Sequence, residues 1–215
     1  VLPRGVSVAA LPGYEEGWFA VQDPATALSV DLLAPRGGEL VLDACAAPGG
    51  KTILMASRMR SGAGVVAMEL HADRLPKLEA NLGRLGFAGV EVVQGDARAP
   101  QEALGDRVFD AILLDVPCSN SGVLRRRSDA RWRMDADRLK ALNVLQFEIL
   151  TACAMRLRSG GRLVYSTCSL EAGENELLVS RWVAAHPDFQ LDREVKAFPP
   201  EAQTDGAFAA LIRRR

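Results

Sequence analysis

The sequence offers few residues for binding a metal ion. None of its four cysteines belongs to a Cys-x-x-Cys pair, and its two histidines, His71 and His186, have no ligand-type neighbours at metal-binding spacing. No apolar run approaches the roughly 20 residues that span a bilayer, and the first residues lack the pattern of a signal peptide. We therefore expect no metal and no membrane association, and we expect free thiols in a reducing cytoplasm.

Neither sign of charge is in clear excess. The formal net charge at pH 7 is −1, and 25% of the residues are charged. Global charge therefore indicates no partner, and any basic surface must be local. A chain of 215 residues fits one α/β domain with a full core. Because the chain does not begin with methionine, we expect a piece of a longer protein from which an upstream domain is missing.

Short apolar runs alternate with amphipathic segments along the chain. These runs predict strands at 39–43, 64–69, 90–94, 108–115, 162–166 and 207–212. The amphipathic segments predict helices at 50–60, 72–85, 139–157 and 174–185, with a turn at 159–161. The alternation indicates an α/β fold with a mainly parallel, doubly wound sheet and right-handed crossovers.

A turn of small residues, Asp43-Ala-Cys-Ala-Ala-Pro-Gly-Gly-Lys-Thr52, connects the first strand to the first helix. A phosphate-binding P-loop needs a glycine where Cys45 stands, and a Gly-x-Gly-x-x-Gly fingerprint is also absent. The small side chains still allow a ligand to approach backbone amides at a helix N-terminus. A tight turn without a ligand is the alternative.

An acidic residue lies at the end of each of three successive predicted strands. Glu69 follows Lys51 by eighteen residues, close to the spacing at which an acid accepts hydrogen bonds from ribose hydroxyls. Asp96 could accept from an adenine amino group, and Asp115 ends the next strand. Each acid alone could be an ordinary cap, but the three together favour an adenosyl cofactor.

Two cysteines each come just after a buried strand, Cys118 in Asp-Val-Pro-Cys-Ser and Cys168 in Tyr-Ser-Thr-Cys-Ser. The carboxyl ends of parallel strands meet at one edge of a sheet, so we expect the two thiols at one edge. The pattern indicates an enzyme that combines a thiol nucleophile with a nucleotide-like cofactor.

These motifs together resemble the Sun-type RNA (cytosine-5) methyltransferases, such as the bacterial 16S rRNA enzymes, over nearly the whole chain. The segments that carry the resemblance are 17–25, 43–52, 115–119, 166–169 with 174–176, and 204–208. The resemblance implies a Rossmann-like class I methyltransferase that uses S-adenosylmethionine and acts on RNA, with ribosomal RNA as the expected substrate. Transfer RNA is the closest alternative. The other is a non-catalytic RNA-binding or ribosome-assembly factor that keeps the fold.

The resemblance also implies roles for individual residues. Cys168 is expected to add to C6 of cytosine, and Cys118 is expected to help its release. Chemistry alone leaves this order open, because DNA cytosine methyltransferases attack with the Pro-Cys thiol. Asp115 is expected on the cytosine ring, and Lys51 as a cation that favours the Cys168 thiolate. The implied cofactor site comprises Cys45, Ala46, Ala47, Pro48, Gly49, Gly50, Lys51, Glu69, Arg74, Asp96 and Asp115.

A basic segment follows the Pro-Cys motif. Residues 124–140 hold seven basic and three acidic side chains, a local net charge of +4. Such a segment suits RNA phosphates, although a solvated helix start is the alternative. Trp132 could stack on a base or serve as a buried anchor, and Trp18 and Trp182 are expected to be packing residues. The expected RNA contacts are Arg125, Arg126, Arg127, Arg131 and Trp132.

The sequence departs from the family pattern at three positions. Asn120 stands where a small residue is usual, Ser128 where proline often occurs, and Glu69 where aspartate is commoner. Asn120 could narrow the base pocket. We expect residues 1–38 to form an N-terminal segment packed on a catalytic domain at 39–215, and we expect the missing upstream domain to bind RNA.

Overall fold

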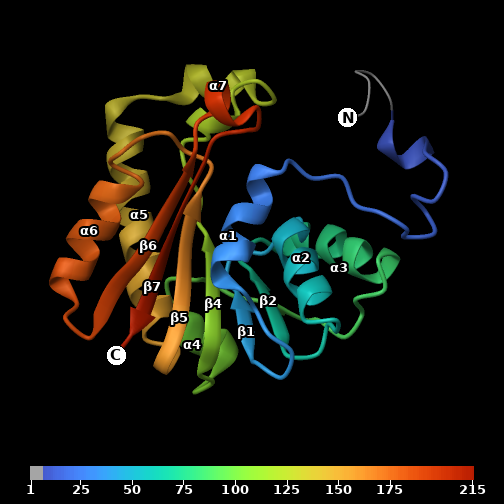
Figure 1. Cartoon of the computed structure of the whole chain (residues 1–215), viewed down its shortest axis with the longest axis horizontal. Helices are drawn as coiled ribbons and strands as arrows, with labels where there is room; N and C mark the ends of the chain where they lie inside the picture. Colours follow the sequence, from blue (N-terminus) through green and yellow to red (C-terminus); the bar gives the residue numbers. More distant parts are fainter. Residues whose placement is uncertain (1–6) are drawn as a thin grey trace.

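Seven strands form one sheet in the computed structural model, which describes residues 7–215 (Figure 1). The order across the sheet is β3-β2-β1-β4-β5-β7-β6, and β7 runs antiparallel to both of its neighbours. The remaining pairs are parallel, which confirms the predicted fold class. The strands are β1 (Val41–Asp43), β2 (Val65–Glu69), β3 (Glu91–Gln94), β4 (Phe109–Asp115), β5 (Leu157–Thr167), β6 (Phe189–Ala197) and β7 (Ala207–Arg214).

Helices cover both faces of this sheet. One face packs against α1 (Ala25–Leu33), α2 (Gly50–Arg58) and α3 (Leu75–Arg84). The other packs against α4 (Pro100–Leu104), α5 (Ala136–Ala154) and α6 (Glu176–Ala185). Strand β4 shows why: Ile112 and Leu114 belong to one core cluster and Ala111 and Leu113 to the other, as expected for a parallel strand buried on both faces. The short elements are η1 (Val8–Ala10), η2 (Ala72–Arg74), η3 (Ser121–Val123), η4 (Ser128–Arg133) and α7 (Pro199–Ala202).

The expected turn at 159–161 lies within β5 rather than before it. Leu157 already pairs with Phe109, and Arg162 pairs with Ala111, so residues between them form an irregularity in which β5 has extra residues. Gly160 takes a positive φ of 73° there, which glycine adopts without strain. Helix α5 consequently ends at Ala154, before the predicted 157, and it begins three residues before the predicted 139.

Helices α1, α4 and α7 and strand β6 are among the elements that were not predicted from the sequence. Strand β6 is one of the two edge strands, and its exposed polar residues hide the usual alternation of a strand. Helix α1 buries Val30 and Leu33 completely, and it packs on β7, β5 and α2. Part of the N-terminal segment therefore contributes to the core.

The two halves of the sheet diverge from β1 and β4. From β1 the chain continues outward to β2 and β3, whereas β4 is followed by β5 on the other side. In a doubly wound sheet, ligands bind outside the carboxyl ends of the strands at this point. Asp43 ends β1, Asp115 ends β4, and Thr167 ends β5, so the candidate residues converge on this edge.

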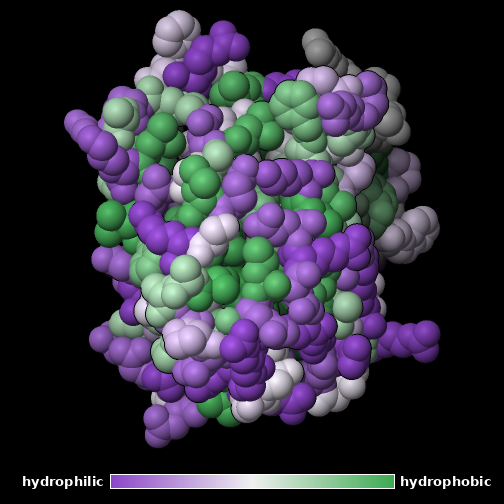
Figure 2. All heavy atoms as spheres, turned by 60° about the vertical axis from the view of Figure 1, so that its left-hand side comes forward, coloured by the Kyte–Doolittle hydropathy of each residue, from purple (hydrophilic) through white to green (hydrophobic). Residues whose placement is uncertain are grey.

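The surface over α5 and α6 has small hydrophobic areas between hydrophilic side chains (Figure 2). Val144 on α5 and Leu177 on α6 are among the exposed apolar residues. Within residues 7–215, no helix combines the length and the apolar character needed to cross a membrane.

Candidate active site

Cys118 and Cys168 lie in contact at the carboxyl ends of β4 and β5. Their Sγ atoms are 3.3 Å apart. The Cys168 thiol also donates to Oδ1 of Asn120 at 3.2 Å, and Nδ2 of Asn120 donates to the Cys118 carbonyl at 2.9 Å. Asn120 has a φ of 61°, a left-handed conformation that asparagine tolerates well. The structure thus brings the two predicted thiols together, and Asn120 bridges them.

The two thiols differ in acidity. The hydrogen bond from Cys118 lowers the pKa of Cys168 and outweighs the effects of burial and of Asp115, and Lys51 lowers it further. The same hydrogen bond, together with burial, raises the pKa of Cys118 well above its ordinary value. Cys168 is therefore the thiol that ionises first. The cation expected beside Cys168 is present, but the neighbouring thiol contributes more.

Lys51, on the first turn of α2, forms an ion pair with Asp115. Its Nζ lies 2.5 Å from Oδ2 of Asp115. Burial alone would lower the pKa of Lys51, but Asp115 and Asp43 raise it, so the lysine remains protonated. Asp43 accepts from Oγ1 of Thr52 at 2.6 Å, and burial raises its pKa to about 6. The buried Asp43 and the partly exposed Asp115 therefore both act on one cation at this edge.

The turn between β1 and α2 approaches Glu69 at the end of β2. Glu69 is buried and accepts from the amides of Ala47 (3.2 Å) and His71 (3.0 Å). Gly49 caps α2 with a φ of 101°, which only glycine adopts readily, and a side chain there would meet Leu78. A carboxylate has about four acceptor positions, so Glu69 keeps capacity for two hydroxyls. The turn, the α2 N-terminus and this acid fit an adenosyl ligand.

Two further residues of the expected cofactor site lie near these elements. Arg74 is 3.7 Å from Glu69. Asp96 follows β3, but Arg98 binds both of its oxygens, with Nη2 at 2.6 Å. Its carboxylate is therefore already paired with an exposed guanidinium that sequence reasoning did not consider. Contact between Asp96 and adenine stays a prediction.

The remaining cysteines have structural surroundings. Cys153 is fully buried on α5, donates to the Ala97 carbonyl at 3.3 Å, and burial raises its pKa to about 12. Cys45 is half-buried in the cofactor turn and packs on the core. All four cysteines are free thiols, and no three His, Cys, Asp or Glu side chains within residues 7–215 gather as metal ligands.

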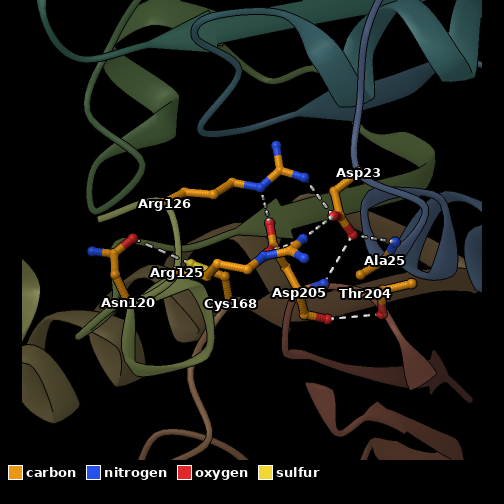
Figure 3. A network of polar contacts seen from close by, with 8 residues as sticks. All are labelled: Asp23, Ala25, Asn120, Arg125, Arg126, Cys168, Thr204 and Asp205. Atoms are coloured by element: carbon orange, nitrogen blue, oxygen red, sulfur yellow. Dashed lines mark hydrogen bonds and ion pairs between the residues drawn. The ribbon is translucent and has the colours of Figure 1, made fainter. Parts of the chain in front are cut away.

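Arg126 belongs to an internal network rather than to an open basic surface (Figure 3). Its guanidinium binds Asp23 at 2.6 Å and Asp205 at 2.8 Å, and both acids are nearly buried. Asp23 also accepts from the amides of Ala25 (3.0 Å) and Asp205 (3.1 Å). The network joins the N-terminal segment, the loop after Cys118 and the turn before β7. Sequence reasoning missed both acids, although Asp23 stands directly before Pro24 and α1.

The other expected RNA contacts are more accessible. Arg125 lies 3.7 Å from Asp205 and 4.0 Å from Asp23, and two thirds of its side chain is exposed. Arg127 and Arg131 are exposed as well. Trp132 is 84% exposed, so it is not a buried anchor. The basic segment thus presents these four side chains to solvent while Arg126 binds internal acids.

The two other tryptophans behave differently from each other. Trp182 is fully buried and stacks on His186 with ring centroids 4.1 Å apart, which confirms its packing role. Trp18 is 77% exposed, so its predicted packing role is wrong. Its ring lies against Gly13 in an N-terminal segment that leaves most of the indole uncovered.

Helix α6 begins at Glu176, two residues later than predicted. Glu174 lies in the preceding turn, is fully buried, and binds residues next to both catalytic cysteine candidates. Sequence reasoning assigned this acid to a helix and missed its contacts, because no local pattern distinguishes a buried glutamate from a helix cap.

Comparison with known proteins supports the same grouping of motifs. Residues 30–213 match the family model described as 16S rRNA methyltransferase RsmB/F. Ribosomal RNA small subunit methyltransferase B from Vibrio cholerae is 43% identical over 97% of this chain and 49% of its own length. The protein of the same name from Serratia proteamaculans is 47% identical over 86% of this chain and 43% of its own length. The chain spans about half the length of these relatives.

A solved structure agrees with the fold in detail. NSun6 from Pyrococcus horikoshii, solved with SFG, has a TM-score of 0.87 and 32% sequence identity, and the match covers 99% of this chain and 56% of that one. The sheet order, the paired thiols and the matched family model over most of the sequence lead to one assignment. The chain belongs to the RsmB/F family of 16S rRNA methyltransferases.

Proposed function

We propose that this chain transfers a methyl group from S-adenosylmethionine to C5 of a cytidine in small-subunit ribosomal RNA. The observation that carries the proposal is the 3.3 Å contact between the Cys118 and Cys168 sulfurs beside the Lys51–Asp115 pair. The names of the Vibrio and Serratia relatives support ribosomal RNA as the substrate. The Sun-type motifs support cytosine C5 as the target atom.

The two thiols suit methylation of a carbon that is a poor nucleophile. A thiolate that adds to C6 of cytosine makes C5 electron-rich enough to accept a methyl group. We assign this addition to Cys168 because its lowered pKa makes it the first of the pair to lose its proton. Asp115, at the end of β4, hydrogen-bonds the ring and stabilises the charge that develops on it.

The second half of the reaction requires a base. Removal of the C5 proton lets its electron pair re-form the C5–C6 double bond and expel the Cys168 thiolate. Cys118 first gives up its own proton to solvent, and its thiolate then takes the C5 proton; we assign it to this step because its sulfur lies in contact with the attacking one. A target base within an RNA helix must first leave its stack to reach these thiols.

The residues of the turn at 45–50, Glu69, Arg74 and Asp96 would hold S-adenosylmethionine, which supplies an electrophilic methyl group when bound. Backbone amides at the N-terminus of α2 suit its carboxylate end, and Glu69 suits its ribose hydroxyls. The NSun6 structure contained SFG, an analogue of S-adenosylmethionine, which supports this cofactor.

RNA would approach over the basic segment beside the cysteine loops. Arg125, Arg127 and Arg131 offer exposed guanidinium groups for phosphates, and Trp132 offers an indole for a base. The whole protein is proposed to contain an upstream RNA-binding domain before the 1–38 segment and the catalytic domain at 39–215. A cytoplasmic location is proposed because its free thiols suit a reducing compartment.

The direct test is incubation with radiolabelled S-adenosylmethionine and total RNA from methylation-deficient cells, followed by nucleoside analysis. Label in 5-methylcytidine from 16S rRNA is the expected result. Label in transfer RNA alone would mean that transfer RNA, and not ribosomal RNA, is the substrate. Cofactor binding without label in any RNA, with the full-length protein also tested, would favour a non-catalytic RNA-binding factor.

Two variants test the order of the thiols. Cys168→Ala should abolish turnover without trapping RNA, whereas Cys118→Ala should accumulate a covalent protein–RNA adduct that survives denaturing electrophoresis. The reverse pattern would make Cys118 the attacking thiol.

A further inference from the structure

Glu174 is a fully buried carboxyl group whose two oxygens bind groups from separate parts of the chain. Oε1 accepts from the Ser119 amide at 2.9 Å and from Nε2 of Gln146 at 2.8 Å. Oε2 accepts from the Ser169 hydroxyl at 2.5 Å. Ser119 directly follows Cys118, and Ser169 directly follows Cys168. One carboxyl group therefore binds the residue after each thiol.

Further hydrogen bonds extend this connection. Nε2 of Gln146, on α5, also donates to the Pro117 carbonyl at 2.8 Å, so both residues that flank Cys118 are held. The hydroxyls of Ser119 and Ser169 are 3.1 Å apart, and Ser121 lies 3.2 Å from Ser169. Few direct backbone hydrogen bonds join the two loops; the amide of Gly122 donates to the Cys168 carbonyl at 2.9 Å.

The partners of the Glu174 oxygens are uncharged donors, so this buried acid is stabilised by hydrogen bonds rather than by an ion pair. Removing a buried acceptor leaves its donors unpaired, which is costly in the buried interior. If the acid were removed, separation of the two loops would let water bind these donors. With Glu174 in place, the same separation would break its hydrogen bonds. The acid thus opposes a movement that would part Cys118 from Cys168.

We propose that Glu174 is a positioning residue that joins the loops at 118–121 and 168–170 and thereby keeps the two thiols in hydrogen-bonding contact. It acts on Cys168 through Cys118, not by touching substrate or cofactor. This inference rests on the catalytic roles proposed above for the two thiols. Its test reads the chemistry of the thiols in the isolated chain, so failure of methyl transfer and failure of this inference remain distinguishable.

The test measures alkylation of Cys168 by iodoacetamide as a function of pH, with the modified peptide identified by mass spectrometry. In Cys118→Ala the midpoint should move to higher pH, because the thiolate loses its hydrogen bond. Glu174→Ala should move it in the same direction, and the double variant should match Cys118→Ala alone. Asp115 and Lys51, the other charged groups that act on Cys168, are present in every variant.

Glu174→Gln should restore a profile closer to that of the unaltered protein, since its amide oxygen can still accept from Ser119 and Gln146 while Ser169 accepts from its nitrogen. Ser169→Ala removes only the hydrogen bond to Oε2 of Glu174, and it should cause a smaller shift in the same direction. This variant replaces Glu174→Ala in the test if Glu174→Ala does not fold. Thr151→Val is the matched control, because it removes a different, partly buried hydrogen bond on α5, from Trp182.

Three results would overturn the inference. The first is an unchanged pH profile in Glu174→Ala or, where that variant does not fold, in Ser169→Ala. The second is a shift in the double variant larger than that of Cys118→Ala, and the third is a shift in Thr151→Val equal to that of Glu174→Ala. The first would mean that the loops hold the thiols without Glu174. The second would mean that Glu174 acts on Cys168 independently of Cys118. The third would mean that general destabilisation explains the effect.

Discussion

The cofactor turn and the cysteine loops lie at the same edge of the sheet but are stabilised in different ways. The turn uses backbone amides, glycine conformations and one buried acid, Glu69. The cysteine loops use side chains, with Glu174, Gln146 and three serines connecting β4 to β5. A backbone-based site is encoded over a few consecutive residues, whereas a side-chain network needs partners far apart in the sequence.

The difference extends to the charges of the two regions. On the cofactor side, Lys51 lies between Asp43 and Asp115. Beyond the cysteine loops, Arg126 lies between Asp23 and Asp205. In the first pair only Asp115, which is partly exposed, forms an ion pair with the lysine, and Asp43 is buried. In the second pair both acids are nearly buried and bind Arg126, which joins distant segments. A change in the first set should therefore alter how stability depends on pH, whereas a change in the second should alter stability itself.

The largest expected effect is that of Asp43→Asn on the pH dependence of stability. Burial raises the pKa of Asp43 to about 6 in the folded chain, compared with about 3.9 when unfolded. A carboxyl group whose pKa is higher in the folded than in the unfolded chain contributes stability to the folded chain below pH 4, and this contribution is lost as pH rises through 6. The stability of Asp43→Asn relative to the unaltered protein should therefore increase by about 2 kcal/mol between pH 4 and pH 7. Urea unfolding at several pH values measures it, and parallel curves would contradict it.

Arg126→Gln should lower stability by about 1–2 kcal/mol, because it removes the cation that lies closest to two nearly buried carboxyl groups. The exposed half of the guanidinium limits the effect. Arg125→Gln is the matched control and should cost less than about 0.5 kcal/mol. Urea midpoints compare the two. Equal losses would show that the two arginines share the network.

The order of the two arginine variants should be reversed when RNA binding is measured, with the larger effect in Arg125→Gln. Arg125→Gln should reduce the slope of log affinity against log salt by about one, as loss of one phosphate contact does. Arg126→Gln should leave the slope unchanged. A larger change in Arg126→Gln would place that arginine, and not Arg125, on the RNA.

Cys118→Ser should preserve most of the reactivity that Cys118→Ala removes from Cys168. A serine hydroxyl still donates a hydrogen bond to the thiolate, so alkylation near neutral pH should slow severalfold in the alanine variant and much less in the serine variant. Equal rates in the two variants would show that Lys51, rather than the neighbouring residue, determines the ionisation of Cys168.

The smallest expected effect is that of Trp132→Ala on RNA affinity, about 1 kcal/mol or fivefold, from the loss of stacking on one base. Trp18→Ala is the control, since Trp18 is similarly exposed but lies outside the basic segment. Fluorescence anisotropy with a single-stranded RNA measures both. A larger loss in Trp18→Ala would move the RNA path to the N-terminal segment.

Much of the fold could be predicted because its signals are local. The apolar runs at β1, β2, β4 and β5 and the leucine spacing in α3 depend only on neighbouring residues. The irregularity in β5 could not be predicted, since the glycines at 160 and 161 read as a turn until the pairing of Leu157 with Phe109 is known. Edge strand β6 was missed because many of its residues are exposed and polar, so its sequence lacks the alternating apolar pattern of a strand with one buried face.

The sequence by itself determined which residues reach the candidate site at the carboxyl edge of the sheet, because residues that end parallel strands must meet there. Asp43, Asp115, Cys118 and Cys168 are placed by that rule alone. Only the tertiary structure decided which polar groups bind one another. Arg126 lies 103 residues from Asp23, and Glu174 lies 55 residues from Ser119. The residues next to a charged side chain in the sequence do not reveal its partner. Only the folded structure therefore distinguishes the arginine that binds internal acids from those that remain accessible to a ligand.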